Sequence, residues 1–161
     1  MQTIKFHWEF YMNSAPAYSR YFAYGSNLSF AQMNRRCPYN LKIGIGILEG
    51  YRWIISKRGY ANVVKSPGDY VLGKVYKITK SDKSTLNKRE GVKRKCYEEK
   101  QMPILVDDDE FNCLVYVDPI VEEGFPDVYY ISTINEGIVD SKLPQDYVKK
   151  YLRDKIPLNG I

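Results

Sequence analysis

Strand-like patterns that follow one another closely dominate the middle of the chain. Isoleucine alternates with glycine over residues 43–47, which is the two-residue period of a half-buried strand, and Gly50 turns the chain into a second strand over residues 51–55. Consecutive strands with short connections predict antiparallel pairing. Glycine inside a strand indicates close backbone approach or the curvature of a barrel. Further strand-forming runs are expected at residues 60–64, 70–76, 97–106 and 111–117.

Two connections between these runs have turn chemistry. Residues 66–69 read Ser-Pro-Gly-Asp, and this turn predicts a hairpin between the strands at 60–64 and 70–76. Residues 107–110 are four consecutive acids, but they lack the alternating ligand spacing and the glycine of a calcium-binding EF-hand loop. We therefore expect a charged hairpin turn there.

A strand, a tight turn and a helix start are predicted early in the chain. Residues 21–28 read YFAYGSNL, an aromatic strand-forming run that breaks at its Gly-Ser pair. Residues 29–32, Ser-Phe-Ala-Gln, are a capping box that starts a helix, and Pro38 ends that helix by Cys37. Backbone N–H groups gathered at such a turn can bind a carboxylate or a phosphate. Most strand-to-helix turns bind no ligand, so the motif alone leaves both interpretations open.

A short polar helix is expected over residues 79–89, with Ser81 or Asp82 as its N-cap and Gly91 in the left-handed position that follows a helix. Glu90 then lies at the last turn, where the helix dipole raises the pKa of a carboxyl group and the lysine and arginine neighbours lower it. From this pattern alone, Glu90 is interpreted as a salt-bridged surface residue.

Two more helices are predicted near the C-terminus. The first covers residues 129–139, and the second begins at Leu143-Pro144. In the second helix Tyr147, Tyr151 and Leu152 share one face at helical spacing, which is typical of core packing.

The N-terminal segment is expected to be an extension of the domain. Apolar and polar residues alternate over residues 1–12, which predicts a half-buried strand, and residues 13–19 read as a connector. The alternative is that translation starts at Met12 and the alternation is accidental. A chain of 161 residues is most economically one domain, so we expect an extension over residues 1–20 and one domain over residues 21–161.

Charge and cysteine content narrow the partners and the compartment. The net charge is +5, but lysine and arginine are scattered except over residues 88–95, which favours a solvated basic surface over a nucleic-acid groove. Cys37, Cys96 and Cys113 have no paired spacing and are odd in number, as expected for buried thiols in the reducing cytoplasm. No window approaches about 18 apolar residues, so we expect no membrane span.

The residue inventory restricts the chemistry. His7 is the only histidine, so a Ser-His or Cys-His nucleophile would depend on that one residue. The sequence also lacks zinc-ligand clusters, a P-loop and a dinucleotide-binding fingerprint, and we expect no metal and no cofactor. What is left is carboxylate acid/base chemistry beside an anion-binding turn. Such a site suits a reaction in which the substrate supplies its own nucleophile.

Four separated motifs resemble the γ-glutamylcyclotransferase family. They are YFAYGSNL at 21–28, GYANVVKSPGD at 59–69 followed by VLG at 71–73, LNKREG at 86–91, and Leu-Pro-x-x-Tyr at 143–147. Their order and spacing run from Tyr21 to about Leu152. The Asn27-Leu28 pair is similar to the branch of the family that acts on γ-glutamyl amino acids, whereas the glutathione-specific branch has Leu-Ile after its YGS.

The resemblance implies an α+β fold, a small mixed and mainly antiparallel β-barrel with peripheral helices. It implies an enzyme that cleaves a γ-glutamyl amino acid or amine to 5-oxoproline and a free amine. Glu90 would be the proton acceptor, and Tyr130, by its distance from Leu143-Pro144, the substrate-contacting tyrosine. The glutamyl head group would be held by the backbone around Tyr21, Phe22, Ala23, Tyr24, Gly25, Ser26 and Asn27.

Two residues depart from the family pattern. Asn87 stands where Leu-Asp-x-x-Glu-Gly usually has aspartate, and Ile138 stands where alanine usually follows Gly137. The first departure bears on how Glu90 is supported. The expected partner is a small γ-glutamyl substrate rather than nucleic acid or a membrane, and a homodimer is left open. Two other hypotheses remain: a non-catalytic module of the same fold that binds γ-glutamyl compounds or carboxylates, and nucleic-acid binding suggested by basicity alone.

Overall fold

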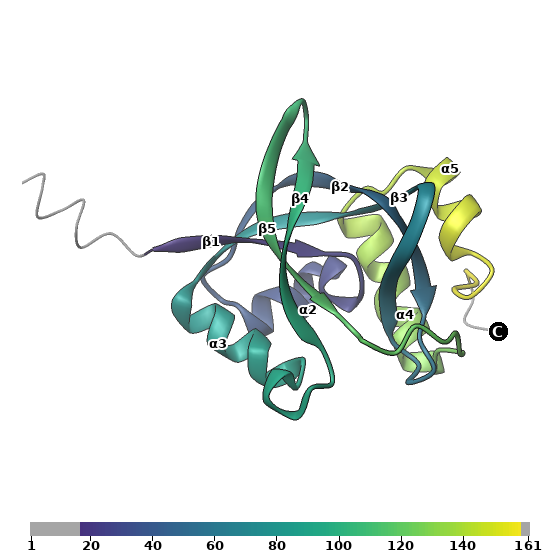
Figure 1. Ribbon diagram of the computed structural model, residues 1–161, viewed down its shortest axis with the longest axis horizontal. Coiled ribbons are helices and arrows are strands. Elements are labelled where there is room, and N and C mark those ends of the chain that lie inside the picture. The colour runs from purple at the N-terminus through teal and green to yellow at the C-terminus, as the bar shows by residue number, and fades with distance from the viewer. Residues whose placement is uncertain (1–16, 159–161) are drawn as a thin grey trace, which may run out of the picture.

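The computed structural model describes residues 17–158, which form a closed barrel of five strands (Figure 1). The strand order is β1-β3-β2-β4-β5, and all neighbours are antiparallel except β1 and β5, which meet in parallel at Tyr21 and Leu114. The expected mainly antiparallel barrel with peripheral helices is confirmed. The strands are β1 (Tyr18–Ala23), β2 (Leu41–Ile55), β3 (Ala61–Thr79), β4 (Glu98–Val106) and β5 (Asp109–Val117).

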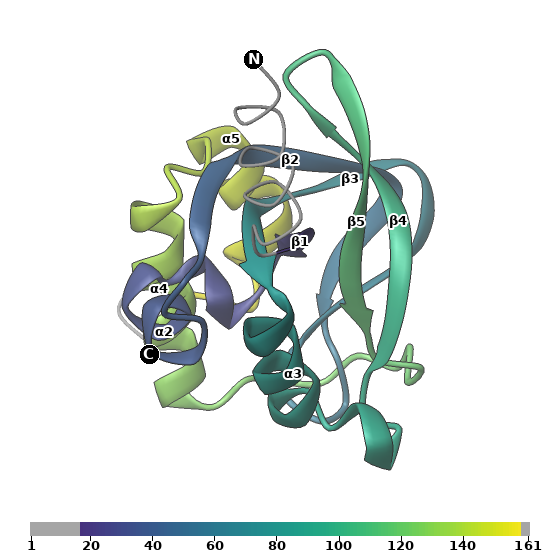
Figure 2. The same cartoon turned by 90° about the vertical axis from the view of Figure 1, so that its left-hand side faces the viewer.

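Helices and helical turns surround the barrel. Figure 2 shows α2, α4 and α5 together on one side of it, away from the β4–β5 hairpin, with α3 at one end. The helical elements are η1 (Ser26–Leu28), α2 (Phe30–Arg36), α3 (Lys80–Arg89), η2 (Val92–Arg94), α4 (Val128–Asp140), α5 (Gln145–Tyr147) and the π-helical turn η3 (Val148–Leu152).

The hairpin predicted at residues 66–69 is wrong. Residues 61–79 form one strand, and both halves of it pair with β2 rather than with each other. Residues 66–69 form a bulge of β3 opposite Gly50, since Glu49 pairs with Tyr70 and Tyr51 pairs with Lys65. For the same reason the two strands predicted on either side of Gly50 are one strand, β2. The turn residues therefore bend a continuous two-stranded ribbon instead of reversing it.

Glycine inside the strands allows close packing against the neighbouring strands, as the sequence predicted. A Cβ atom on Gly46 would lie 2.6 Å from Ile104 Cγ2, and one on Gly73 would lie 2.3 Å from the carbonyl oxygen of Ala23. These two glycines pair across β2 and β3, and the fully buried ring of Phe22 packs against both. This packing fixes the end of β1, where the chain leaves the barrel for η1.

The helix caps agree with the predictions in part. Ser29 accepts a hydrogen bond from the Gln32 N–H, and α2 ends at its C-cap Cys37, as expected. The N-cap of α3 is Thr79 and not Ser81 or Asp82, because the Thr79 hydroxyl accepts from the Asp82 N–H. The residue after α3 adopts the helical C-cap conformation, and Gly91 then has the predicted left-handed φ of 62°.

The other predicted elements are placed as follows. The acidic turn between β4 and β5 and the helix α4 are confirmed. Tyr147 and Leu152 are buried, as predicted, in an irregular helical segment. The strand predicted at residues 1–12 lies outside the described residues, whereas β1 already begins at Tyr18, inside the expected connector. Among the helices of residues 17–158, none is long and apolar enough to cross a membrane.

Candidate active site

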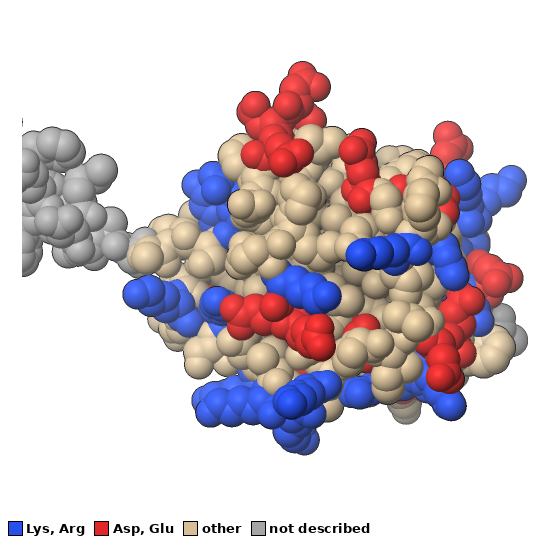
Figure 3. Space-filling model, viewed as in Figure 1, with Lys and Arg blue, Asp and Glu red and all other residues tan. Residues whose placement is uncertain are grey.

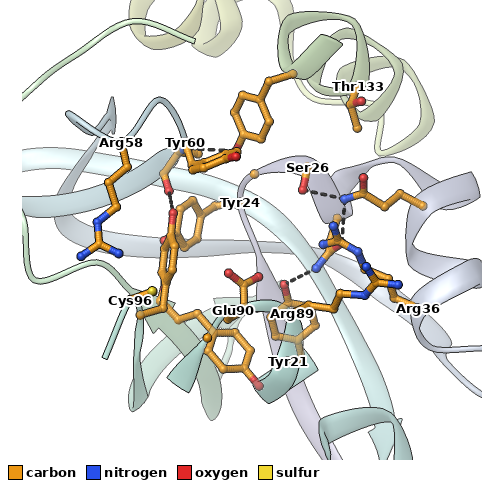
Figure 4. Close-up of a pocket in the computed structure, with 18 of the residues that line it drawn as sticks. Tyr21, Tyr24, Ser26, Arg36, Arg58, Tyr60, Arg89, Glu90, Cys96 and Thr133 are labelled. Carbon is orange, nitrogen blue, oxygen red and sulfur yellow. Dashed lines mark hydrogen bonds between the residues drawn. The ribbon is translucent and has the colours of Figure 1, made fainter. Parts of the chain in front are cut away.

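A cavity of about 610 Å³ opens where the end of β1, η1, the start of β3, the end of α3 and the start of α4 meet (Figure 4). Ala23 is the one expected site residue that does not line it, because its side chain is buried in the core beneath α2 and α3. The remaining expected residues do line the cavity: Tyr21, Phe22, Tyr24, Gly25, Ser26, Asn27, Glu90 and Tyr130. The YGSN turn and Glu90, which are distant in sequence, therefore meet in one cavity.

The YGSN turn is shaped by close packing against α4. The Leu28 N–H donates to the Gly25 carbonyl at 3.0 Å, which closes the turn. A Cβ atom on Gly25 would lie 3.0 Å from the Tyr130 hydroxyl, and one on Gly137 would lie 2.4 Å from Leu28 Cβ. Glycine at both positions lets α4 approach the turn and places the Tyr130 hydroxyl beside it.

The side chain of Asn27 stabilises the turn, because its amide nitrogen and oxygen both form hydrogen bonds within the protein. Its side chain is buried and donates to the Tyr21 hydroxyl at 2.9 Å, while its Oδ1 accepts from Gln32 Nε2 and Arg36 Nη1 at 3.0 Å each. Gln32 also donates to Ser26 Oγ at 2.6 Å instead of closing the predicted capping box (Figure 4). Since Ser26 Oγ accepts this bond, its hydroxyl hydrogen is free for a ligand.

The tyrosine hydroxyls around the cavity differ in the direction of their hydrogen bonds. Tyr24, Tyr97 and Tyr116 each donate their hydrogen to the protein, respectively to the Tyr116 carbonyl, the Ala61 carbonyl and Asn87 Oδ1. Tyr21 and Tyr130 instead accept, from Asn27 Nδ2 and from the Ala61 N–H, both at 2.9 Å. Tyr21 and Tyr130 are therefore the hydroxyls of this set that can donate to a ligand.

Glu90 is the carboxylate of the cavity, at the end of α3. Burial raises its pKa from 4.5 to about 7, and the nearby Arg36 lowers it in part. The interpretation of Glu90 as a salt-bridged surface residue is wrong, because no cation of residues 17–158 forms an ion pair with it. The position at the end of a helix predicted a raised pKa through the helix dipole. The largest cause of the raised pKa is instead desolvation of the carboxylate by elements that are distant in sequence.

Asn87, the departure from the family pattern, supports the wall of the cavity. Its Oδ1 accepts from the Tyr116 hydroxyl, and its Nδ2 donates to Glu99 Oε2 at 3.3 Å. The Tyr116 carbonyl in turn accepts from the Tyr24 hydroxyl. Asn87 thus positions the Tyr116 hydroxyl and does not bond to Glu90.

The GYAN motif at residues 59–62 holds the opposite wall. Ala61 bonds to two cavity tyrosines through its backbone, as described above, and Asn62 is fully buried. The Asn62 amide donates to the carbonyls of Asp118 and Ile120 at 2.9 and 3.1 Å and accepts from the Asp118 N–H at 2.9 Å. These bonds fix the segment that follows β5 against the start of β3.

None of the arginines that line the cavity was predicted as a site residue from the sequence. They are Arg36, Arg58, Arg89 and Arg94. Arg36 follows Gln32 by one helical turn, and that spacing places both side chains on the face of α2 that meets η1. No comparable local signal marks Arg58, because what holds it is a distant aspartate.

The donor set of the cavity defines its chemistry. Within residues 17–158 no group of three or more histidine, cysteine, aspartate or glutamate side chains is arranged to hold a metal ion. The cavity offers a carboxylate that titrates near neutrality, hydroxyl donors and guanidinium groups. Such a site can bind an anionic ligand and exchange a proton with it.

Comparisons with known proteins relate this chain to a family. Residues 70–151 match the AIG2-like family. A Mus musculus gamma-glutamylcyclotransferase is 32% identical over 144 residues, which cover 81% of this chain and 75% of the relative. A Bos taurus gamma-glutamylcyclotransferase is 33% identical over 141 residues with the same coverage. A solved structure of a gamma-glutamyl cyclotransferase has a TM-score of 0.77 at 28% identity and covers 83% of this chain and 86% of its own.

Proposed function

The chain belongs to the γ-glutamylcyclotransferase family of enzymes, and we propose that it converts a γ-glutamyl amino acid or amine to 5-oxoproline with release of the free amine. The observation that carries this proposal is the cavity in which the YGSN turn meets Glu90. The substrate's α-amine attacks its own γ-carbonyl carbon. The new C–N bond closes a five-membered ring, and the bond from that carbon to the leaving nitrogen breaks.

The YGSN turn is proposed to bind the α-carboxylate of the glutamyl group. The Ser26 hydroxyl keeps its hydrogen for a ligand because it accepts from Gln32. Arg36 is anchored through one nitrogen to Asn27, which leaves its other guanidinium donors for the carboxylate. Holding the glutamyl chain folded for attack draws on the roughly 7–11 kcal/mol available to well-oriented intramolecular reactions.

Glu90 is proposed to move the proton. Its carboxylate accepts a proton from the α-ammonium, which frees the amine to attack, and passes that proton to the leaving nitrogen. The ring nitrogen, which is positively charged once the C–N bond has formed, loses its second proton through the same carboxylate to the departing amine. A pKa of about 7 suits both steps, because the two protonation states are comparably populated at neutral pH. General acid/base assistance of this kind contributes about 10²- to 10⁴-fold in rate.

Tyr21 and Tyr130 are proposed to stabilise the charge that develops on the γ-carbonyl oxygen. Each hydroxyl is fixed by an N–H group that donates to its oxygen, so each O–H is oriented before the substrate binds. No covalent intermediate with the enzyme is needed, since the nucleophile belongs to the substrate.

A small γ-glutamyl compound in the cytoplasm is proposed as the ligand of this site. The free thiols of Cys37 and Cys113 are buried, which suits a reducing compartment. On the face in Figure 3, acidic side chains lie between the basic ones, which supports a small-molecule ligand over a long nucleic acid.

The test is to incubate the purified protein with γ-glutamyl-alanine and to quantify 5-oxoproline and alanine. We expect the two products in equal amounts. Absence of 5-oxoproline across a panel of γ-glutamyl amino acids and amines, combined with tight binding of 5-oxoproline, would contradict an enzyme and favour the binding module.

A further inference from the structure

Arg58 lies in the turn between β2 and β3 and lines the cavity on the side away from the YGSN turn. In Figure 4, Glu90 lies between Arg58 on one side and Ser26 with Arg36 on the other. Burial raises the pKa of the Tyr97 hydroxyl, and the guanidinium of Arg58 is close enough for its charge to oppose that rise in part. A positive charge therefore stands at the end of the cavity that the α-carboxylate does not use.

A buried carboxylate holds Arg58 in this position. Arg58 Nε lies 3.6 Å from Oδ2 of Asp118, whose side chain has no exposed surface. The same carboxylate accepts from the Ser56 hydroxyl at 3.3 Å and from the Ile120 N–H at 2.8 Å. Asn62 also bonds to the backbone carbonyl and N–H of Asp118. The position of the Asp118 carboxylate is therefore fixed, and it restrains the guanidinium of Arg58.

The anchored geometry leaves one edge of the guanidinium free. Asp118 occupies the Nε edge, and neither η nitrogen of Arg58 has a hydrogen-bond partner among residues 17–158. The Arg58 side chain is 34% exposed. Two parallel N–H groups at the end of a fixed guanidinium match the two oxygens of a carboxylate.

We propose that Arg58 binds a carboxylate carried by the leaving amine and so makes the enzyme prefer γ-glutamyl amino acids to γ-glutamyl amines. This inference rests on the proposed function. With the α-carboxylate at the YGSN turn and the γ-carbonyl beside Glu90, the leaving group extends toward Arg58. The substrate would then be bound by an arginine at each end: Arg36 at the glutamyl α-carboxylate and Arg58 at the carboxylate of the leaving group.

The inference is tested with a pair of substrates that differ only in this carboxylate. γ-Glutamyl-ethylamide is γ-glutamyl-alanine without the carboxylate of alanine. A charge-assisted pair of hydrogen bonds corresponds to about a 10- to 100-fold preference in kcat/KM for γ-glutamyl-alanine, which we expect in the wild type. Equal kcat/KM for the two substrates would overturn the role of Arg58 and leave the proposed function intact. Turnover of neither substrate would overturn both.

Variants then assign the preference to Arg58. Arg58→Gln is expected to lower the ratio of the two kcat/KM values to within about threefold of unity, mainly through KM for γ-glutamyl-alanine. Arg58→Lys keeps the charge without the paired donors and should restore part of the ratio. The matched control is Lys57→Gln, which removes an exposed charge paired with Glu122 outside the cavity and should leave the ratio unchanged.

An unchanged ratio in Arg58→Gln would overturn the inference, as would an equal loss in Lys57→Gln. Because Arg58→Gln leaves the buried Asp118 without its cation, its folding is checked by thermal unfolding. If it does not fold, Arg58→Lys decides, since a ratio equal to that of the wild type in this variant would contradict the need for paired donors.

Discussion

Two carboxylates in this protein lie among tyrosines, and their pKa values move in opposite directions. Glu90 sits in the cavity, where burial raises its pKa to about 7. Asp69 sits in the bulge of β3, near the tilted and edge-on rings of Tyr70, Tyr147 and Tyr151. Hydrogen bonds from the Ser66 hydroxyl, and next from the Tyr151 hydroxyl at 2.7 Å, lower the pKa of Asp69.

The contrast shows that aromatic surroundings do not by themselves make a reactive acid. Hydroxyl groups that donate to Asp69 stabilise its charged form. Around Glu90 the hydroxyls of Tyr24, Tyr97 and Tyr116 donate to other acceptors. Burial therefore destabilises the charged form of Glu90, and these hydroxyls do not offset that cost with hydrogen bonds. The direction of the tyrosine hydrogen bonds thus separates a site for proton transfer from a structural contact.

The largest expected difference between the two carboxylates is in catalysis. Glu90→Gln should lower kcat for γ-glutamyl-alanine by about 10²- to 10⁴-fold, because the amide cannot accept the proton. The matched change Asp69→Asn should leave kcat as in the wild type. Both are measured by 5-oxoproline release, and turnover by Glu90→Gln at the wild-type rate would contradict the assignment of the base.

Stability should respond to pH in opposite ways at the two positions. The folded pKa of Glu90 is raised from 4.5 to about 7, so wild-type stability falls as pH rises between these values. Glu90→Gln should therefore be more stable than the wild type above pH 7, by at most about 3 kcal/mol, with the gain vanishing below pH 4.5.

Asp69 has a lowered folded pKa, so its ionised form adds stability above its ordinary pKa of 3.8, and that stability is lost as pH falls through the lowered value. Asp69→Asn should lower the free energy of unfolding at pH 7 and lose its effect in acid. Denaturant unfolding across this pH range measures both variants. A gain for Asp69→Asn at pH 7 would contradict the comparison.

Tyrosine hydroxyls from the two regions form the next comparison. Tyr130→Phe removes a proposed donor to the substrate and should lower kcat/KM by about 10-fold. Tyr151→Phe removes a donor to Asp69 and should not change kcat/KM, because Tyr151 does not line the cavity. Equal activity of the two variants would show that the Tyr130 hydroxyl plays no part in turnover.

The smallest difference is expected in the position of the pH profile, which the charge beside Glu90 influences, apart from the loss of kcat/KM that follows from removing a proposed ligand of the α-carboxylate. Arg36 lowers the pKa of Glu90, so Arg36→Gln should move the acidic limb of the kcat/KM profile to higher pH. Arg35→Gln is the control, because the neighbouring Arg35 is exposed and does not line the cavity. A shift of the limb to lower pH in Arg36→Gln would contradict the stated origin of the pKa.

Local sequence patterns predicted the elements of this fold better than their connections. Alternation over residues 43–47, with glycine at positions 44 and 46, predicted a curved antiparallel strand, since these signals act within one strand. The same turn residues at 66–69 suit a hairpin and a bulge equally well. Only the register with β2 decides between the two, and that register depends on the whole length of both strands.

The candidate site was predictable to the extent that its residues belong to a recurring motif. The YGSN turn and Glu90 were connected through family resemblance, whereas residue chemistry alone placed Glu90 at the surface. Its environment comes from β1, β3 and α4, which local patterns do not bring together. Arg58 went unnoticed for a similar reason, because Asp118, its anchor, lies on the segment after β5.

The central claim is that the carboxylate of Glu90 is the group whose ionisation controls turnover. The direct measurement is the ¹³C NMR titration of the Glu90 side-chain carboxyl, followed alongside kcat/KM for γ-glutamyl-alanine over the same pH range. We predict that both curves have their midpoint at about 7. A carboxyl that titrates near 4.5, or an acidic limb that persists unchanged in Glu90→Gln, would contradict the claim.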